Sequence, residues 1–229
     1  MDIKKSIHNV ITNIDQIPIS EDDLKFKLAW GLKELNPSMN VSIEYPVNKD
    51  LLGVDNIGNN KLLYYDLMVE NKNNFIPIEI KYKTKHLKLL RNILGSEDDL
   101  ELKNQSAQNL AKYGFWKDVY RIQSLKNQFK SVNKGYQIFL TNDASYKRQS
   151  RENSQVKNFD ICEGRHVEKE TKLLWSDEDG CKINNVSHAK YKSKTFYKKE
   201  GFIIENNNVL KWDTVKIQGF DFYVLILEV

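Results

Sequence analysis

The sequence predicts an α/β fold in a single domain of 229 residues. Three observations indicate it: a hairpin of two apolar strands in residues 64–83, an amphipathic helix before this hairpin, and helical and strand segments that follow it as far as residue 142. Strands and helices that alternate in this way are typical of a sheet covered by helices. A chain of this length can also bury a substantial core.

The first helix of the core is predicted to begin directly after Ser20, which can cap its N-terminus. Three acids follow, Glu21, Asp22 and Asp23, and the helix dipole favours negative charge in the first turn. A stripe of leucines then continues until Pro37. Glu21 falls within that stripe, so its carboxylate should point toward the sheet. Its alternative role is that of an ordinary acid at the start of a helix.

The stretch YYDLMVENKNNFIPIEIKYK, residues 64–83, predicts a hairpin whose loop is the polar run at residues 71–74. Symmetric pairing about this loop places Asp66 opposite Glu79. Because side chains alternate between the faces of a strand, Glu79 and Lys81 would share a face with Asp66. The other face should be apolar and buried, with Tyr65, Leu67, Val69, Ile78, Ile80 and Tyr82.

Two opposed carboxylates repel each other unless a cation lies between them. Mg²⁺ prefers hard oxygen ligands and commonly brings phosphate groups to its site, and Mn²⁺ could take the same place. Lys81 could hold or deprotonate an attacking water, or neutralise charge on a phosphate. The alternative is a solvated strand face on which Lys81 only forms ion pairs with the acids.

Asp66 with Glu79, Ile80 and Lys81 resembles the signature of the PD-(D/E)xK nuclease superfamily, with Tyr65 where the pattern name has Pro. The stretches IPIEIKYKTK and LKNQSAQNL are similar to bacterial members. The resemblance implies a restriction-endonuclease-like αβββαβ core with a mixed sheet flanked by helices, at about residues 20–142, and a C-terminal β-rich elaboration at about 143–229. It also implies that the metal ligands are Asp66, Glu79, the Ile80 carbonyl and Glu21.

Residues 96–99 look like a helix cap, which predicts helical structure as far as residue 129, divided or kinked at Gly114. The resemblance implies a Gln on this helix near the active site. Gln105 is the preferred candidate and Gln108 the second, although a Gln in the middle of a helix is otherwise an ordinary surface residue.

Asp118 and Arg121 lie three residues apart in this segment, which predicts an ion pair on the helix surface. The sequence also predicts a further strand of the sheet at residues 135–141. The nearly continuous apolar run at residues 220–229 predicts a buried strand.

The net charge of +4 is too small to indicate nucleic-acid binding, but the segment SHAKYKSKTFYKK at residues 187–199 contains five lysines and no acid. Lysines can neutralise phosphates and aromatic rings can stack on bases. A lysine-protected edge strand is the alternative. The predicted nucleic-acid contacts are Lys190, Tyr191, Lys192 and Lys194, together with Lys147 and Arg148 just past the core.

Two cysteines, Cys162 and Cys181, give no disulfide framework. With His166 and His188 they could be drawn as a zinc site, but their spacing matches no common zinc knuckle. The sequence also lacks an apolar run long enough to cross a bilayer and a signal-peptide pattern at its start, so a cytoplasmic protein is expected.

Together these features predict a Mg²⁺-dependent nuclease that hydrolyses phosphodiester bonds, in DNA first of all, by a metal-activated water. A homodimer would suit paired cuts in duplex DNA. Two alternatives remain open: a nuclease-like fold that binds nucleic acid or a partner protein without cutting, and an RNA nuclease such as a toxin.

Overall fold

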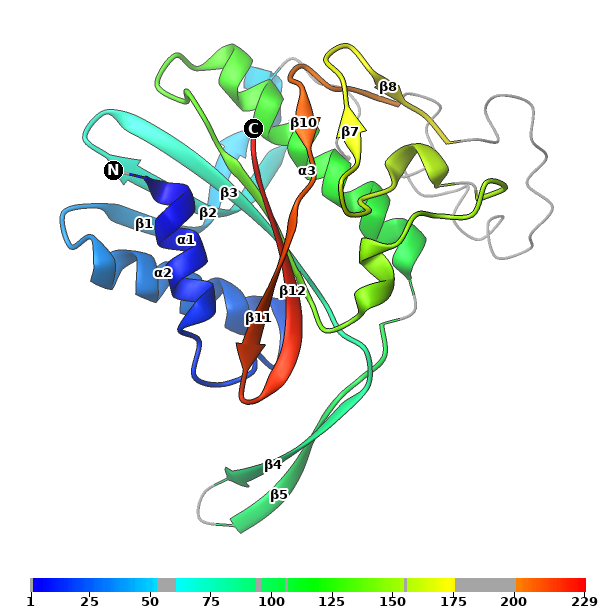
Figure 1. Ribbon diagram of the computed structural model, residues 1–229. Helices are drawn as coiled ribbons and strands as arrows, with labels where there is room; N and C mark the ends of the chain where they lie inside the picture. Colours follow the sequence, from blue (N-terminus) through cyan, green and yellow to red (C-terminus); the bar gives the residue numbers. More distant parts are fainter. Residues whose placement is uncertain (1, 53–60, 94–95, 106, 155, 176–200) are drawn as a thin grey trace.

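The protein is α/β, with a mixed sheet whose two faces are covered by helices (Figure 1). The structure, a computed structural model, describes residues 2–52, 61–93, 96–105, 107–154, 156–175 and 201–229. Six strands form the sheet in the order β1 (Asn40–Asn48), β2 (Leu62–Asn71), β3 (Asn74–Lys83), β6 (Tyr136–Thr141), β12 (Phe220–Glu228) and β11 (Trp212–Ile217). Strand β6 runs parallel to β3, and the other neighbours are antiparallel.

Helices α1 (Ile3–Thr12) and α2 (Glu21–Leu35) pack on one face of the sheet, and α3 (Gln108–Gln128) packs on the other. Each face has its own apolar cluster, and every residue of β6 is buried. The predicted cap of α2 is confirmed, because the Asp23 N–H donates to Ser20 Oγ at 3.0 Å. The predicted strands at residues 135–141 and 220–229 are confirmed as β6 and β12.

The hairpin of β2 and β3 has the predicted register as far as Leu67 with Ile78, but the ladder ends there, so the predicted pair of Asp66 with Glu79 is not formed. The loop is also shorter than predicted, because Asn71 and Asn74 pair as strand residues. The prediction that Tyr65 shares an apolar face with Leu67 is wrong, because Tyr65 packs in the cluster under α3 and Leu67 in the cluster under α2. The reason is a break in the β1–β2 ladder, where Glu44 and Asp66 are both unpaired. Glu44 adopts φ 51° there, and the alternation of side chains reverses across the break.

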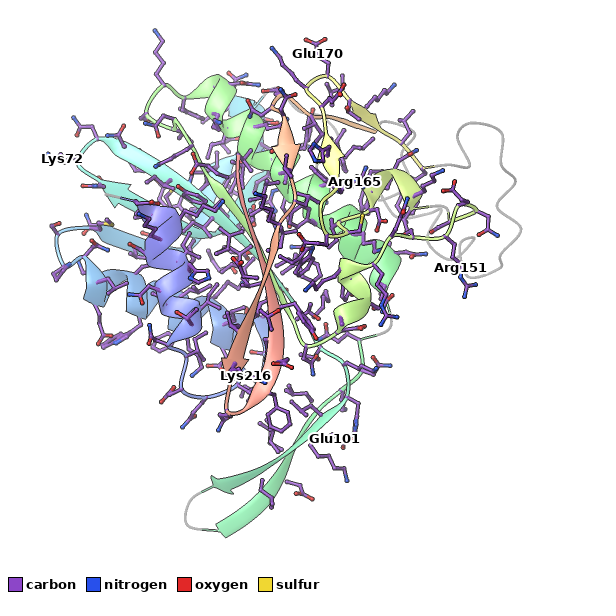
Figure 2. The ribbon with its side chains drawn as sticks, viewed as in Figure 1. Lys72, Glu101, Arg151, Arg165, Glu170 and Lys216 are labelled. Atoms are coloured by element: carbon purple, nitrogen blue, oxygen red, sulfur yellow. The ribbon has the colours of Figure 1, made fainter. Side chains whose placement is uncertain are left out.

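Strands β4 (Leu87–Ile93) and β5 (Ser96–Leu102) pair as a second hairpin, which projects from the body (Figure 1). Glu101 of β5 is labelled in Figure 2. The prediction of a helix beginning at residues 96–99 is therefore wrong. Leu89 and Leu102, at the base of the hairpin, are buried in the cluster under α2. Helix α3 begins only at Gln108 and continues past Gly114 as one helix.

The segments between β6 and β11 cover the outer side of α3. They comprise η2 (Ala144–Lys147), η3 (Lys157–Phe159), β7 (His166–Val167), β8 (Lys172–Leu173), β9 (Phe202–Ile203) and β10 (Asn208–Val209). Phe159, Trp175 and Phe202 each lie 5.1 Å from the Tyr113 ring of α3, measured between ring centroids. This aromatic contact joins the β-rich elaboration and the sheet in one core. None of the helices in the described ranges is long and apolar enough to cross a membrane.

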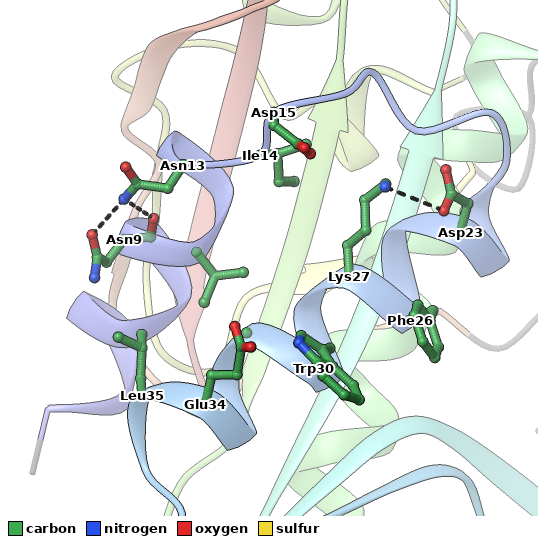
Figure 3. A pocket seen from close by; sticks show the side chains of 12 residues that line it. Asn9, Asn13, Ile14, Asp15, Asp23, Phe26, Lys27, Trp30, Glu34 and Leu35 are labelled. Atoms are coloured by element: carbon green, nitrogen blue, oxygen red, sulfur yellow. Dashed lines mark hydrogen bonds and ion pairs between the residues drawn. The ribbon is translucent and has the colours of Figure 1, made fainter.

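An open groove of about 770 Å³ lies between α1 and α2 (Figure 3). Phe26 and Trp30 line it and stack on each other with ring centroids 6.3 Å apart, and both side chains are more than half exposed. The groove lies on the outer side of α2. The carboxylate of Glu21, by contrast, binds the backbone of β3.

Candidate metal and active site

The candidate site lies where the ladder between β2 and β3 ends. Its last pair is Leu67 with Ile78, and beyond it the N–H groups of β3 meet side-chain carboxylates. The Ile80 N–H donates to Asp66 Oδ2 at 2.7 Å, and the Tyr82 N–H donates to Glu21 Oε2 at 2.8 Å. The predicted direction of Glu21, toward the sheet, is therefore confirmed. The Ile80 carbonyl accepts a long hydrogen bond of 3.4 Å from Lys81 Nζ.

Glu79 is almost completely buried, with 1% of its surface exposed. Its Oε1 lies 3.2 Å from Arg121 Nη1 but has no aligned hydrogen bond among the described residues. Burial raises the pKa of Glu79 well above its ordinary value of 4.5; Arg121 opposes this effect, whereas the charges of Asp118 and Asp66 add to it. The Asp66 charge acts on Glu79. The prediction that Asp66 shares a face with Glu79 and Lys81 is not confirmed. Asp66 Oδ1 contacts Lys25 of α2, whereas Glu79 and Lys81 contact Arg121 and Asp118 of α3, which covers the other face.

Lys81 extends from β3 toward α3, where its Nζ lies 2.5 Å from Asp118 Oδ2. Burial alone would lower the pKa of Lys81, but the carboxylates of Asp118, Glu21 and Glu79 raise it above its ordinary value. The side chain is therefore an ammonium ion at neutral pH.

The prediction that Asp118 and Arg121 form a surface ion pair is wrong in its location. The Asp118 Oδ1 and Arg121 Nη1 atoms are 3.6 Å apart, but both side chains point from α3 into the site. Asp118 is three residues after buried Phe115 and four before buried Ile122, so it lies within the apolar stripe of the helix. A carboxylate inside such a stripe was the sequence signal for this residue.

The sequence analysis did not predict a role for Lys25 of α2, which directly follows Leu24 of the leucine stripe. In the structure Lys25 is only 7% exposed. Its Nζ donates to the Glu44 carboxylate and lies 3.0 Å from Asp22 Oδ1 and 3.2 Å from Asp66 Oδ1. Asp66 is thus bound on one side by the Ile80 amide and on the other by an ammonium ion.

Gln105 does not lie on a helix, which corrects its predicted position. Its side chain is exposed in the segment between β5 and α3, and its N–H donates to the Thr84 carbonyl at 2.9 Å. Because residues 96–102 form strand β5, helix α3 begins later in the sequence than predicted. Gln108 occupies the first position of α3 instead, and its Nε2 donates to Asp143 Oδ2 at 2.8 Å.

Two of the predicted nucleic-acid contacts, Lys147 and Arg148, lie within the described residues. Lys147 Nζ lies 4.8 Å from the centroid of the Tyr223 ring, and Arg148 is exposed. The other four predicted contacts lie outside the described residues: Lys190, Tyr191, Lys192 and Lys194. Two of the four residues weighed as a zinc site, Cys181 and His188, also lie outside them. Within the described ranges, no group of three or more His, Cys, Asp or Glu side chains is placed to hold a metal ion.

Comparison of the chain with family models, with curated proteins and with solved structures found no match.

Proposed function

We propose that the chain is a metal-dependent nuclease that hydrolyses phosphodiester bonds in DNA. One observation carries the proposal: Glu21 and Asp66, from two other elements, both bind the backbone of β3 next to the Glu79-Ile80-Lys81 step. The element order supports it, because α2, β1, β2, β3, α3 and β6 follow one another as an αβββαβ core, with the β4–β5 hairpin inserted before α3.

The donors around this step are carboxylates and a backbone carbonyl, the hard oxygen ligands that Mg²⁺ and Mn²⁺ prefer. Asp66, Glu79 and the Ile80 carbonyl would hold the ion, with Glu21 as a further acid. The buried Glu79 Oε1, which lacks an aligned hydrogen bond in the described structure, supports this fit. Glu79 would exchange its contact with Arg121 for the ion. When bound, the metal would activate a water and stabilise the negative charge that develops on the phosphate.

Lys81 would act through its charge. Its raised pKa keeps it protonated at neutral pH, so it cannot accept a proton from water in this state. An ammonium ion can orient the attacking water and neutralise the phosphate. Of the roles open to Lys81, positioning and electrostatic stabilisation are therefore preferred over general-base catalysis.

A second function, binding of nucleic acid or a partner protein without cutting, is favoured by one feature of the same site. The strand motif, Glu79-Ile80-Lys81 of β3, has two charged residues, and each forms an ion pair with a residue of α3. Glu79 pairs with Arg121, and Lys81 pairs with Asp118. Such pairing would make the cluster a structural element that joins helix and sheet.

The two functions are separated by incubating the protein with supercoiled plasmid, linear duplex, single-stranded DNA and RNA, in Mg²⁺, Mn²⁺ or EDTA. The variants are Asp66→Asn and Lys81→Met. Their matched controls are Asp221→Asn and Lys216→Met, because these residues form an exposed ion pair of 2.7 Å between β12 and β11. Lys216 is labelled in Figure 2. Metal-dependent cleavage should be lost in the two site variants and retained in the two controls.

Cleavage of RNA in preference to every DNA substrate would change the substrate class. Absence of cleavage, combined with DNA binding that neither metal nor either site variant alters, would replace the nuclease proposal by the binding function.

A further inference from the structure

The Lys25 ammonium is surrounded by three carboxylates from three elements. Asp22 comes from the first turn of α2, Glu44 from β1 and Asp66 from β2. The Asp22 and Asp66 oxygens lie 3.0 and 3.2 Å from Nζ, and Glu44 accepts a hydrogen bond from it. The side chains of Lys25 and Asp66 are 9% and 15% exposed, whereas that of Asp22 is open to solvent. The chain thus binds a positive charge of its own at Asp66.

The local backbone is built around this point. Glu44 has φ 51°, a left-handed conformation that is uncommon and unfavourable for a residue with a side chain. It lies opposite Asp66, at the one position where the β1–β2 ladder omits a pair. Both residues released from the ladder contact Lys25. The left-handed conformation of Glu44 and the break in the ladder therefore both occur where the two carboxylates contact Lys25.

Asp66 divides its two oxygens between two partners. Oδ2 accepts the Ile80 N–H beside the proposed metal ligands, and Oδ1 lies next to Lys25. In a site with two metal ions, a bridging carboxylate gives an oxygen to each ion. We infer that the Lys25 ammonium takes the place of a second metal ion, so that the site formed by Asp66, Glu79 and the Ile80 carbonyl binds a single divalent ion. This inference depends on the function proposed above.

A fixed positive charge beside Asp66 weakens the binding of another cation to the same carboxylate. Its removal would leave three carboxylate oxygens around one point, at distances that a small contraction would bring into the range of divalent-cation coordination. Lys25 therefore sets the number of ions that the site can hold, and its replacement by a neutral residue should create a second cation site.

The test is a titration with Mn²⁺ in the absence of nucleic acid, with free Mn²⁺ measured by electron paramagnetic resonance. The variant is Lys25→Met, and Lys25→Arg keeps the charge. The matched control is Lys27→Met, on the same helix, whose ammonium lies 3.6 Å from the Asp23 carboxylate instead of in the site. Asp66→Asn identifies the ions that depend on Asp66.

The wild type, Lys27→Met and Lys25→Arg should each bind one Asp66-dependent ion. Lys25→Met should bind a second ion, at least about tenfold more tightly than the wild type does. If Lys25→Met does not fold, as judged by circular dichroism, Lys25→Gln replaces it, because Gln is neutral and still donates hydrogen bonds to the carboxylates.

Two Asp66-dependent ions bound by the wild type would overturn the inference. A Lys25→Met titration that matches that of Lys27→Met would also overturn it. Neither result would contradict the proposed metal-dependent nuclease. Absence of Mn²⁺ binding by the wild type and all variants would instead overturn the proposed function, and the inference with it.

Discussion

Lys81 Nζ lies 2.5 Å from the Asp118 carboxylate, and the other charged residue of the strand motif, Glu79, is matched in the same way by Arg121. Two residues one helical turn apart on α3 thus oppose, in sign, two residues on β3. Three of the four side chains are nearly buried, which limits screening by water. Loss of one member of a buried pair leaves an uncompensated charge and is strongly destabilising.

Replacement of Asp118 by Asn should therefore lower the free energy of unfolding of the metal-free protein by about 3 kcal/mol. Urea denaturation measures the loss. Asp221→Asn, which breaks an exposed pair with Lys216, should cost less than about 1 kcal/mol. The double variant Asp118→Leu with Lys81→Met should recover part of the stability, because no buried charge is then left alone. A cost no larger than that of Asp221→Asn would contradict a buried pair.

Glu79→Gln should change how stability depends on pH. Because the folded pKa of Glu79 is raised, the folded protein holds a proton that the unfolded chain has already released above pH 4.5. Stability should therefore fall as pH rises from that value through the folded pKa, by about 1.4 kcal/mol for each unit of elevation. Glu79→Gln should lack this decrease.

Urea midpoints of the wild type and Glu79→Gln, compared from about pH 4 to about pH 8, test the expectation. Glu152→Gln serves as the control, since its carboxylate is exposed in an ion pair with Lys157. Parallel curves for the wild type and Glu79→Gln would show that burial does not raise the pKa of Glu79.

Gly31→Ala should destabilise the packing of α1 on α2. A Cβ at Gly31 would lie 2.7 Å from Val10 Cγ1 and 2.9 Å from Cγ2, closer than side chains approach. Overpacking typically costs about 1 to 3 kcal/mol, and the helix propensity of Ala returns up to about 1 kcal/mol. We expect a net loss of about 1 kcal/mol in thermal or urea unfolding. Val10→Ala should relieve it in the double variant, so additive effects would exclude the contact as its cause.

Lys147→Ala and Arg148→Ala should weaken DNA binding at low salt. If each side chain neutralises a phosphate, its loss reduces the slope of log affinity against log salt by about one. The Lys147 variant also loses the contact with the Tyr223 ring, so its stability should be measured alongside. Fluorescence anisotropy at several salt concentrations gives the slopes. A slope unchanged from that of Lys216→Ala would remove these two residues from the interface.

The sequence was informative where structure is decided locally. The polar run at residues 71–74 and the alternation beside it were enough to predict the β2–β3 register as far as Leu67 and Ile78. Helical periodicity placed the Glu21 carboxylate on the side that meets the sheet. Both predictions depend on neighbours in the chain, and both are confirmed.

Features that depend on distant contacts were missed. The reversal of alternation at Asp66 involves Glu44 of another strand, so it could not be read from the hairpin alone. The inward direction of Asp118 requires α3 to dock on β3. The acidic run before α3 suits both a helix start and an exposed strand, and only its pairing with β4 decides between them.

The earlier residues of β3 pair with strand β2. The amides of Ile80 and Tyr82, further along β3, donate to side-chain carboxylates instead. Asp66 and Glu21 consequently complete the sheet as well as the site. An alanine at either position would leave a backbone donor without its acceptor, and part of the resulting loss of activity would come from the altered strand. Asparagine and glutamine keep the acceptor, so only these replacements separate the chemistry of the two acids from their part in the architecture.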